Sequence, residues 1–143
     1  MERHQSITAC AVIVKGQKAF IAKRAATKKF LPNKFEIPGG HVEFGEAPEE
    51  ALKRELIEEM GLKIEVLMPF HAFAYLTDNG NDHCIEIDYL AKIKPEDQRI
   101  TLRPEEHSEF RWISEAEIPD YLQNNDPEAA AIRKGLELMR KMK

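Results

Sequence analysis

Three glutamates in one short segment have the spacing of a metal-binding site. Glu55 precedes Glu58 by three residues and Glu59 by four, and this spacing places their carboxylates on one side of an α-helix. Like charges at that spacing repel each other, so a bound cation would stabilise the cluster. Carboxylate oxygens suit hard Mg²⁺ or Mn²⁺ better than Zn²⁺. The alternative is a solvated acidic helix face, which is what most charge runs form.

The residues around this cluster predict the helix that would position it. Residues 49–60 have helix-forming composition without an internal glycine, and Pro48 falls in the first turn, where its missing N–H is tolerated. Gly61 tolerates the left-handed conformation that ends many helices. We therefore expect a helix that begins near Pro48 and stops at Gly61.

The whole segment from residue 40 to residue 62 resembles the Nudix box. It matches the pattern G-x5-E-x7-R-E-U-x-E-E-x-G-U, where U is an aliphatic residue, at every specified position. Chance agreement is on the order of 10⁻⁷ or less if each residue type has a frequency of about one in ten to twenty. The chain is therefore similar to Nudix hydrolases. This resemblance implies an α/β fold, the Nudix-type α/β/α sandwich with a mixed β-sheet between helices, formed by a single Nudix hydrolase domain over residues 1–143.

The resemblance also implies a reaction. Nudix enzymes hydrolyse a nucleoside diphosphate linked to another moiety, with a metal-activated water that breaks a P–O–P bridge. Because the substrate is polyanionic, Mg²⁺ held by carboxylates, with Mn²⁺ as the alternative, would reverse the local charge and lower the pKa of the attacking water. The alternative of another class is a non-catalytic nucleotide-binding Nudix module. Such a module would be expected to have lost box glutamates, and this sequence retains them.

The family's metal-binding roles carry over onto matching positions of this sequence. Glu58 and Glu59 would be metal ligands, and Glu55 would be a ligand or the general base. The main-chain carbonyl of Gly39, just before the box, would be a further metal ligand. Together these residues would form the catalytic centre.

The other box positions would support those ligands. Arg54 and Glu46 would hold each other and orient the glutamates, so Arg54 would serve catalysis mainly through structure. Gly40 and Gly61 would be structural positions, and Gly40 would also let the backbone approach the substrate closely.

A further carboxylate is expected from the loop before the late aromatic strand. The candidates are Glu105, Glu106 and Glu109. The spacing to Trp112 favours Glu106, which would be both a catalytic residue and a metal ligand.

Residues outside the box resemble the MutT-like branch, which converts nucleoside triphosphates to monophosphates and pyrophosphate. The similar stretches are residues 20–26, 33–40 and 125–127. The alternative substrates are ADP-ribose, nucleotide sugars and dinucleoside polyphosphates. Residues 77–80 lack the proline or tyrosine that marks two of those other branches.

Substrate contacts are expected at positions outside the metal cluster. Arg24 would bind a phosphate through charge-assisted hydrogen bonds, or would lie in a solvated turn. Phe73 would stack on a nucleobase or belong to the core. Asn125 would hydrogen-bond a purine edge or serve as a turn residue.

Apolar periodicity predicts the remaining elements. Strands are expected at residues 7–14, 18–24, 34–37, 42–44, 64–76, 83–93 and 110–113. One helical turn opened by Ser114 should stop at Pro119, and an amphipathic helix should begin at Asp126. One face of residues 83–93 is apolar, and the other is acidic. The acidic face, which we expect in solvent with a pocket wall as the alternative, carries Cys84, Glu86, Asp88 and Leu90.

Composition limits the class of protein. The chain has 143 residues, a hydrophobic content of 43% and a net charge of −4, which indicate a soluble globular domain without the basic field that binds nucleic acid polymers. It contains no apolar run of membrane-spanning length and no signal-peptide core, so we expect a cytoplasmic protein without a membrane partner. Cys10 and Cys84 are expected to be small buried residues. The expected partner is a small nucleotide, and the expected form is a monomer or a homodimer.

Overall fold

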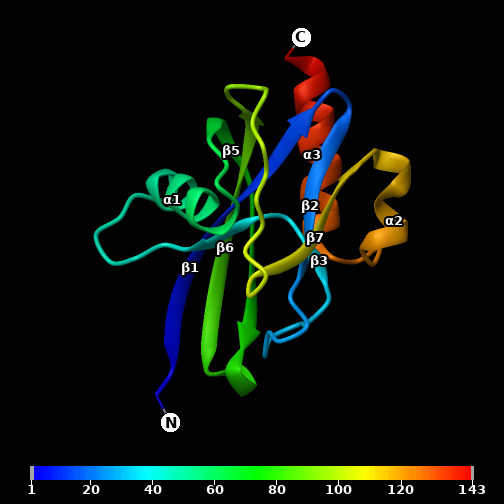
Figure 1. The fold of residues 1–143 in the computed structure, drawn as a ribbon. Coiled ribbons are helices and arrows are strands. Elements are labelled where there is room, and N and C mark those ends of the chain that lie inside the picture. Colours follow the sequence, from blue (N-terminus) through cyan, green and yellow to red (C-terminus); the bar gives the residue numbers. More distant parts are fainter. Residues whose placement is uncertain (1, 143) are drawn as a thin grey trace.

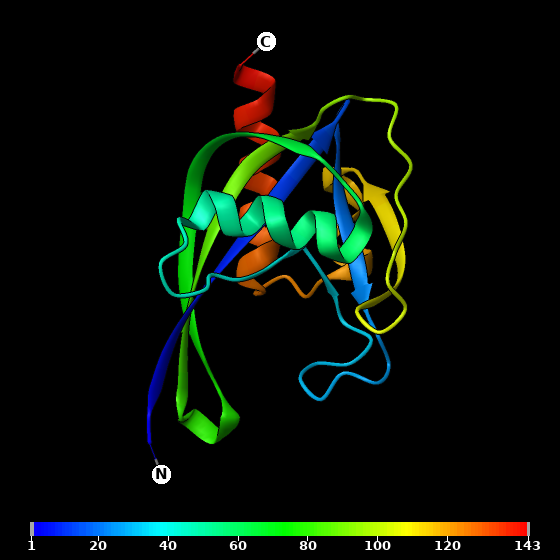
Figure 2. The same cartoon turned by 60° about the vertical axis from the view of Figure 1, so that its left-hand side comes forward.

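A mixed β-sheet lies between two helices in this chain. The computed structural model, which describes residues 2–142, places helix α1 (Pro48–Met60) on one face of the sheet and helix α3 (Pro127–Lys141) on the other (Figure 1). Figure 2 shows α1 crossing in front of the strands, with α3 behind them. This arrangement confirms the α/β/α sandwich that the sequence predicts.

The sheet combines parallel and antiparallel pairing. Its strands are β1 (His4–Lys15), β2 (Lys18–Arg24), β3 (Phe35–Glu36), β4 (Gly39–His41), β5 (Ile64–Thr77), β6 (Asp82–Ile93) and β7 (His107–Ile113). Their order is β3-β2-β1-β6-β5, with β4 also paired to β1 and β7 to β2. The β1–β6 pair is parallel and the other pairs are antiparallel. Short helical segments occupy η1 (Asp78–Gly80), η2 (Glu115–Glu117) and α2 (Ile118–Tyr121).

Strand β1 is the centre of the fold because both of its faces are buried. Successive side chains of a strand point to opposite faces, and here each face meets a different helix. The cluster on the α1 side contains Ala9, Ala11, Ile13, Leu52, Leu56 and Met60. The cluster on the α3 side contains Cys10, Val12, Val14, Ala129, Ile132 and Leu136. Each buried cluster holds one helix in a fixed position relative to the strand ends.

Two local predictions were wrong. The strand expected at residues 42–44 lies earlier, at Gly39–His41, and Phe44 is fully exposed. The absence of side chains on Gly39 and Gly40 lets this segment pair with β1, so pairing displaces the strand toward the glycines. Pro119 does not stop the helical turn, because it lies in the first turn of α2, where proline is tolerated.

Both cysteines are free and buried, as expected. Across residues 2–142, no helix combines the length and apolar character that crossing a membrane requires.

Candidate active site

One face of helix α1 is buried against the sheet, and this fixes the position of its glutamates. Leu52, Leu56 and Met60 recur every four residues and are fully buried, so one stripe of the helix is fixed against the sheet. Gly61 then ends the helix with a φ of 62°, and its N–H donates to the carbonyl of Ile57. The predicted helix limits are confirmed, and the rotation of the helix sets where each glutamate points.

Arg54 is the centre of a hydrogen-bonded cluster on this helix. Its Nε and Nη2 donate to both carboxylate oxygens of Glu46 at 2.7 and 3.0 Å. Its Nη1 donates to Glu55 and Glu58, each at 3.1 Å, and its Nη2 also donates to the carbonyl of His41. The hydrogen bonds from Arg54 lower the pKa of Glu46 to about 2. Arg54 therefore fixes the direction of the neighbouring carboxylates, with Glu46 as its bidentate partner.

Glu59 is a buried carboxyl group beside other carboxyl groups. It is 8% exposed, whereas the side chain of Glu58 is 50% exposed and faces Arg54. Burial, the hydrogen bond with Glu55 and the charges of Glu55 and Glu106 raise the pKa of Glu59 to about 10. Such a cluster of carboxyl oxygens is the type of ligand that a hard divalent cation prefers, and a bound cation would favour the ionised form of Glu59.

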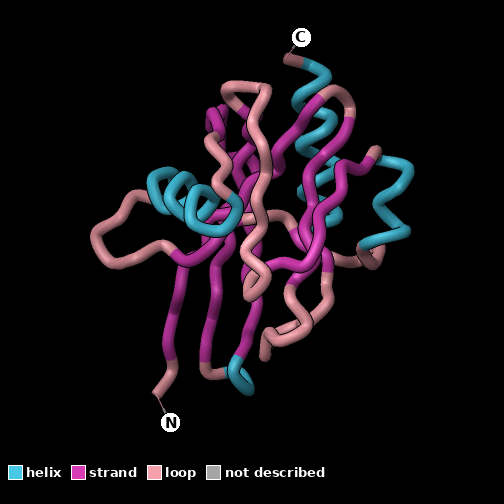
Figure 3. Tube along the Cα trace, in the orientation of Figure 1, coloured by secondary structure: helices cyan, strands magenta, loops and turns pink. Residues whose placement is uncertain are grey.

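The loop between β6 and β7 docks onto the end of α1 (Figure 3). The N–H of Thr101 donates to the carbonyl of Met60 at 3.0 Å, and the N–H of Arg103 donates to the carbonyl of Glu59 at 3.1 Å. The last carbonyls of a helix lack partners within it, so the loop satisfies them. This docking carries Glu106 to the neighbourhood of Glu59.

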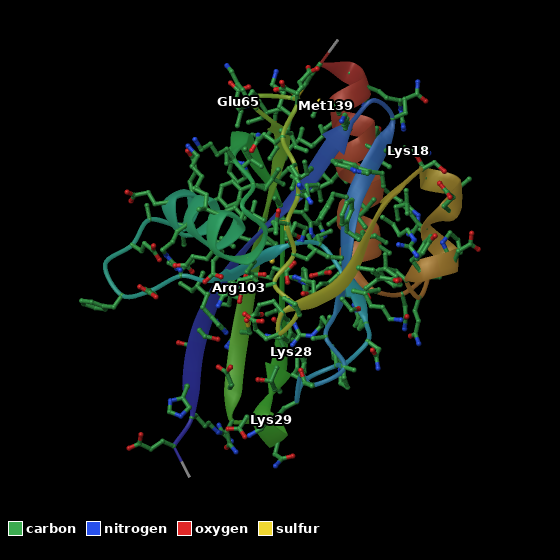
Figure 4. The ribbon with its side chains drawn as sticks, in the orientation of Figure 1. Lys18, Lys28, Lys29, Glu65, Arg103 and Met139 are labelled. Carbon is green, nitrogen blue, oxygen red and sulfur yellow. The ribbon has the colours of Figure 1, made fainter. Side chains whose placement is uncertain are left out.

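The three candidates for the distal carboxylate lie in different surroundings. Glu106 lines a cleft and forms an ion pair with Lys28, which comes from the loop between β2 and β3 (Figure 4). Glu105 and Glu109 instead pair with the neighbouring Arg103 and Arg111. The geometry therefore favours Glu106 over the other two.

His107 is a site residue that the sequence did not reveal. It is 2% exposed, and its Nε2 lies 3.0 Å from an oxygen of Glu36. Its Nδ1 has no hydrogen-bond partner among residues 2–142 and lies 3.7 Å from Glu59 Oε1. Glu36 also accepts a hydrogen bond from Arg24 at 3.2 Å, so a chain of polar contacts connects Arg24 to Glu59.

A cleft of about 1030 Å³ opens beside these glutamates, a size suited to a small-molecule ligand. The predicted site residues that line it are Arg24, Gly39, Gly40, Glu55, Glu59, Phe73, Glu106 and Asn125. The remaining predicted residues, Glu46, Arg54, Glu58 and Gly61, are outside its lining. The structure thus separates the residues that face the cleft from those that support them.

Gly39 and Gly40 are needed because other groups approach them closely. Neither has a positive φ, so the reason lies in the space around them and not in their backbone dihedrals. A Cβ on Gly40 would lie 2.3 Å from the Cδ of Glu55, and a Cβ on Gly39 would lie 2.2 Å from the carbonyl oxygen of Ala9. The Pro38 carbonyl accepts a hydrogen bond from the N–H of Ala11 on β1. Because successive carbonyls of a strand point in opposite directions, the Gly39 carbonyl points away from β1.

The acidic face of β6 is buried, so the expectation that it meets solvent was wrong. Cys84, Glu86 and Asp88 are all buried, and the first two line the cleft. The reason is that α3 covers this face, and the α3 residue Glu128 is itself 8% exposed. The half-buried Phe73 of β5 lies opposite Glu86 and also lines the cleft, which does not fit a core position.

Comparison with known proteins identifies one family. The family model described as "NUDIX domain" matches residues 3–134. The 8-oxo-dGTP diphosphatase of Escherichia coli is 45% identical over 56 residues, which cover 39% of this chain and 43% of that protein. The nucleoside triphosphatase NudI of Klebsiella pneumoniae is 28% identical over 141 residues, covering 94% of this chain and 99% of that protein. The first of these matches spans less than half of the relative's length.

Solved structures share the fold. The MutT protein from Methanosarcina mazei has a TM-score of 0.75 at 20% identity, covering 99% of this chain and 97% of that chain. The MutT NUDIX hydrolase from Burkholderia pseudomallei has a TM-score of 0.72 at 24% identity, covering 93% of this chain and 96% of that chain. At such identities the likeness establishes the architecture alone.

Proposed function

The chain belongs to the NUDIX family of hydrolases, and on this premise we propose that it is a Mg²⁺-dependent pyrophosphohydrolase that converts nucleoside triphosphates to monophosphates and pyrophosphate. The observation that carries this proposal is the buried carboxyl group of Glu59, which lies beside Glu55 and Glu106 at a nucleotide-sized cleft. Two relatives are named as enzymes that act on nucleoside triphosphates, which supports the choice of substrate.

The residues present fit a divalent cation. Glu55, Glu59 and Glu106 all line the cleft, and the Gly39 carbonyl faces away from β1. Among residues 2–142 these three carboxyl groups do not have oxygens that all lie within 4.8 Å of one another, so a cation would have to draw them together. Glu58 lies outside the lining of the cleft, where Arg54 holds it, and it would have to turn toward the cleft to serve as a ligand. Bound Mg²⁺, or Mn²⁺ in its place, would neutralise phosphoryl charge and lower the pKa of the attacking water.

The protein's own groups position the reaction. Glu55 lines the cleft and is hydrogen-bonded by Arg54, so it is placed to accept the proton of the attacking water. Arg24 lines the same cleft, and Glu36 and the carbonyl of Phe30 hold its guanidinium, which is suited to a substrate phosphate. Such fixed charges lower the barrier mainly by positioning and by stabilising developing negative charge.

A substrate panel tests the activity. We expect Mg²⁺-dependent release of pyrophosphate and a monophosphate from at least one nucleoside triphosphate, scored by chromatography. The panel holds normal and oxidised dNTPs, ADP-ribose, diadenosine polyphosphates and nucleotide sugars, each with an EDTA control. Cleavage confined to the last three groups would replace the proposed substrate. Binding without any turnover would favour a non-catalytic nucleotide-binding module.

Mg²⁺ itself should stabilise the protein and release protons on binding. A ligand that binds only the folded state stabilises it, by about 2.7 kcal/mol at 100 times its Kd. The pKa of Glu59 is raised to about 10 without metal, so Glu59 must lose its proton to become a ligand. Thermal unfolding with and without Mg²⁺, and calorimetry in buffers of different ionisation enthalpy, measure the two effects. A Tm that neither Mg²⁺ nor Mn²⁺ changes would contradict the metal assignment.

A further inference from the structure

A row of buried carboxyl groups lies at the wall of the cleft, apart from the α1 glutamates. Glu86 and Asp88 on β6 are 3% and 0% exposed, and Glu128 on α3 is 8% exposed. The carboxyl groups of Asp88 and Glu128 lie close enough to that of Glu86 for both to raise its pKa. Among residues 2–142, no lysine or arginine forms an ion pair with any of the three.

The ends of this row are anchored by other groups. His71 Nδ1 lies 2.8 Å from one oxygen of Asp88, and the N–H of Ile37 donates to Glu128 at 3.0 Å. In the described part of the chain, no N–H or hydroxyl donates to Glu86 Oε2 or Asp88 Oδ1. The groups near enough to satisfy these oxygens are the neighbouring carboxyl groups, and two carboxyl groups can hydrogen-bond only when one carries a proton. Glu86 lines the cleft, so when its proton is turned toward the cleft and away from its neighbours, Glu86 offers a hydroxyl donor and a carbonyl acceptor side by side.

The surroundings of Glu86 keep that proton in place. Burial, followed by the charge of Glu128 and the contacts with Asp88, raises the pKa of Glu86 far above its ordinary value. Burial is also the main reason that the pKa of Glu128 rises to about 8. The other titratable or charged groups around the row come from each neighbouring element: Cys10 on β1, Lys34 and Glu36 at β3, His71 and Tyr75 on β5, and Cys84 on β6.

Aromatic rings flank the point where Glu86 meets the cleft. Phe73 lies opposite Glu86 in the β5–β6 ladder, and its ring centroid is 5.8 Å from that of Tyr75. Phe30, from the loop after β2, stacks on Tyr75 with an interplanar angle of 10°. All four side chains line the same cleft. A ligand at this point would meet flat apolar faces together with one adjacent donor and acceptor.

We propose that the Glu86 carboxyl, held by Asp88 and Glu128, is the group that recognises the nucleobase of the substrate. Every nucleobase has an edge that presents an acceptor next to a donor, and its ring stacks on aromatic faces. A phosphate would meet carboxyl oxygens here, so the chemistry of this wall suits the base and not the phosphate chain. This inference rests on the proposed function in one respect, which is that the ligand is a nucleotide.

A metal ion is the competing occupant. Cys10 Sγ and oxygens of Glu86 and Asp88 lie within 4.8 Å of one another, which would allow shared coordination. Protons shared between the carboxyl groups would satisfy the same oxygens without a cation. His71 and the N–H of Ile37 are the partners of other oxygens of Asp88 and Glu128. The two occupants differ in what a glutamine at position 86 would do, because glutamine keeps a donor and an acceptor but is a poor metal ligand.

The test is equilibrium binding of nucleoside 5′-monophosphates in EDTA to wild type, Glu86→Gln and Glu86→Leu. The probes are AMP, GMP, CMP and UMP, with ribose 5-phosphate as the ligand that lacks a base. Glu86→Leu should weaken the best-bound monophosphate on the order of 10-fold, because it removes buried hydrogen bonds to the ligand. Glu86→Gln should bind within about 3-fold of wild type, since it preserves a donor and an acceptor. Ribose 5-phosphate should compete equally with all three proteins.

Several results would overturn the inference. If the Glu86 variants lost affinity equally for the monophosphates and for ribose 5-phosphate, Glu86 would have only a structural role. Glu86→Gln binding as weakly as Glu86→Leu would mean that an ionised carboxylate is required. A thiolate-to-cobalt absorption band on adding Co²⁺, absent in Cys10→Ser, would assign the row to a metal. If no triphosphate is hydrolysed but binding still depends on Glu86 as described, the proposed function fails and this inference stands.

Discussion

Glu59→Gln should leave the fold intact and lower turnover by at least about 100-fold. That figure is a lower bound, because mutating even the outer-shell partners of a metal typically costs about 10-fold to 100-fold. Glutamine has the shape of glutamate, so the buried position loses no packing. It cannot ionise, so it cannot supply the carboxylate that metal binding would draw from Glu59 beside Glu55 and Glu106. The measurement is kcat at saturating Mg²⁺ on the substrate that the panel identifies.

The same substitution should stabilise the protein when metal is absent. The pKa of Glu59 is about 10 in the folded state against 4.5 for the ordinary group, so the folded state binds a proton that the unfolded state has released. At pH values between these two pKa values, the contribution of Glu59 to the free energy of unfolding falls by up to about 1.4 kcal/mol for each unit of rising pH. Glutamine does not titrate, so the Tm of Glu59→Gln in EDTA should exceed that of wild type increasingly as the pH rises.

Glu49→Gln is the matched control for both effects. Glu49 lies in the first turn of the same helix, its side chain is 52% exposed, and it pairs with Lys53. This variant should retain wild-type turnover and the wild-type dependence of Tm on pH. If Glu59→Gln behaved like Glu49→Gln in turnover and in Mg²⁺ dependence, Glu59 would have no part in metal binding.

The features that could be predicted from the sequence are those that local rules determine. Helix α1 follows from composition, from Pro48 in its first turn and from Gly61 at its end. The contact between Arg54 and Glu46, by contrast, is implied by the resemblance to the Nudix box. The limits of the helix depend on residues within a few turns of one another, where spacing fixes geometry.

The features that escaped prediction depend on which layer covers a face. Alternation in β6 shows that two faces differ, but it does not show that α3 buries the acidic one. Glu128 of α3 lies near Glu86, and His71 of β5 contacts Asp88, and no local pattern encodes either contact. His107 and Glu36 lie far apart in the sequence and meet because β3 and β7 both pair with β2.

The two adjacent glycines should give opposite results when each is replaced by alanine. In Gly40→Ala the new Cβ would lie 2.3 Å from the Cδ of Glu55, and the side chain of Glu55 can move away. Turnover should fall about 100-fold, because a displacement of about 1 Å of a catalytic group has an effect of that order. In Gly39→Ala the Cβ would lie 2.2 Å from the Ala9 carbonyl oxygen and 2.6 Å from the Cys10 Cα, and a central strand cannot move away.

Gly39→Ala should therefore lower the free energy of unfolding by about 1–3 kcal/mol or more, as overpacking of a rigid site does. Gly40→Ala should change it by less, because a side-chain rotation relieves its clash. Urea unfolding and kcat at saturating Mg²⁺ separate the two variants. Replacing Glu55 by alanine should remove the clash, so Gly40→Ala should have a smaller effect on stability in a Glu55→Ala background than in wild type. Wild-type turnover in Gly40→Ala, or equal loss of stability in both glycine variants, would mean that Gly40 does not make room for Glu55.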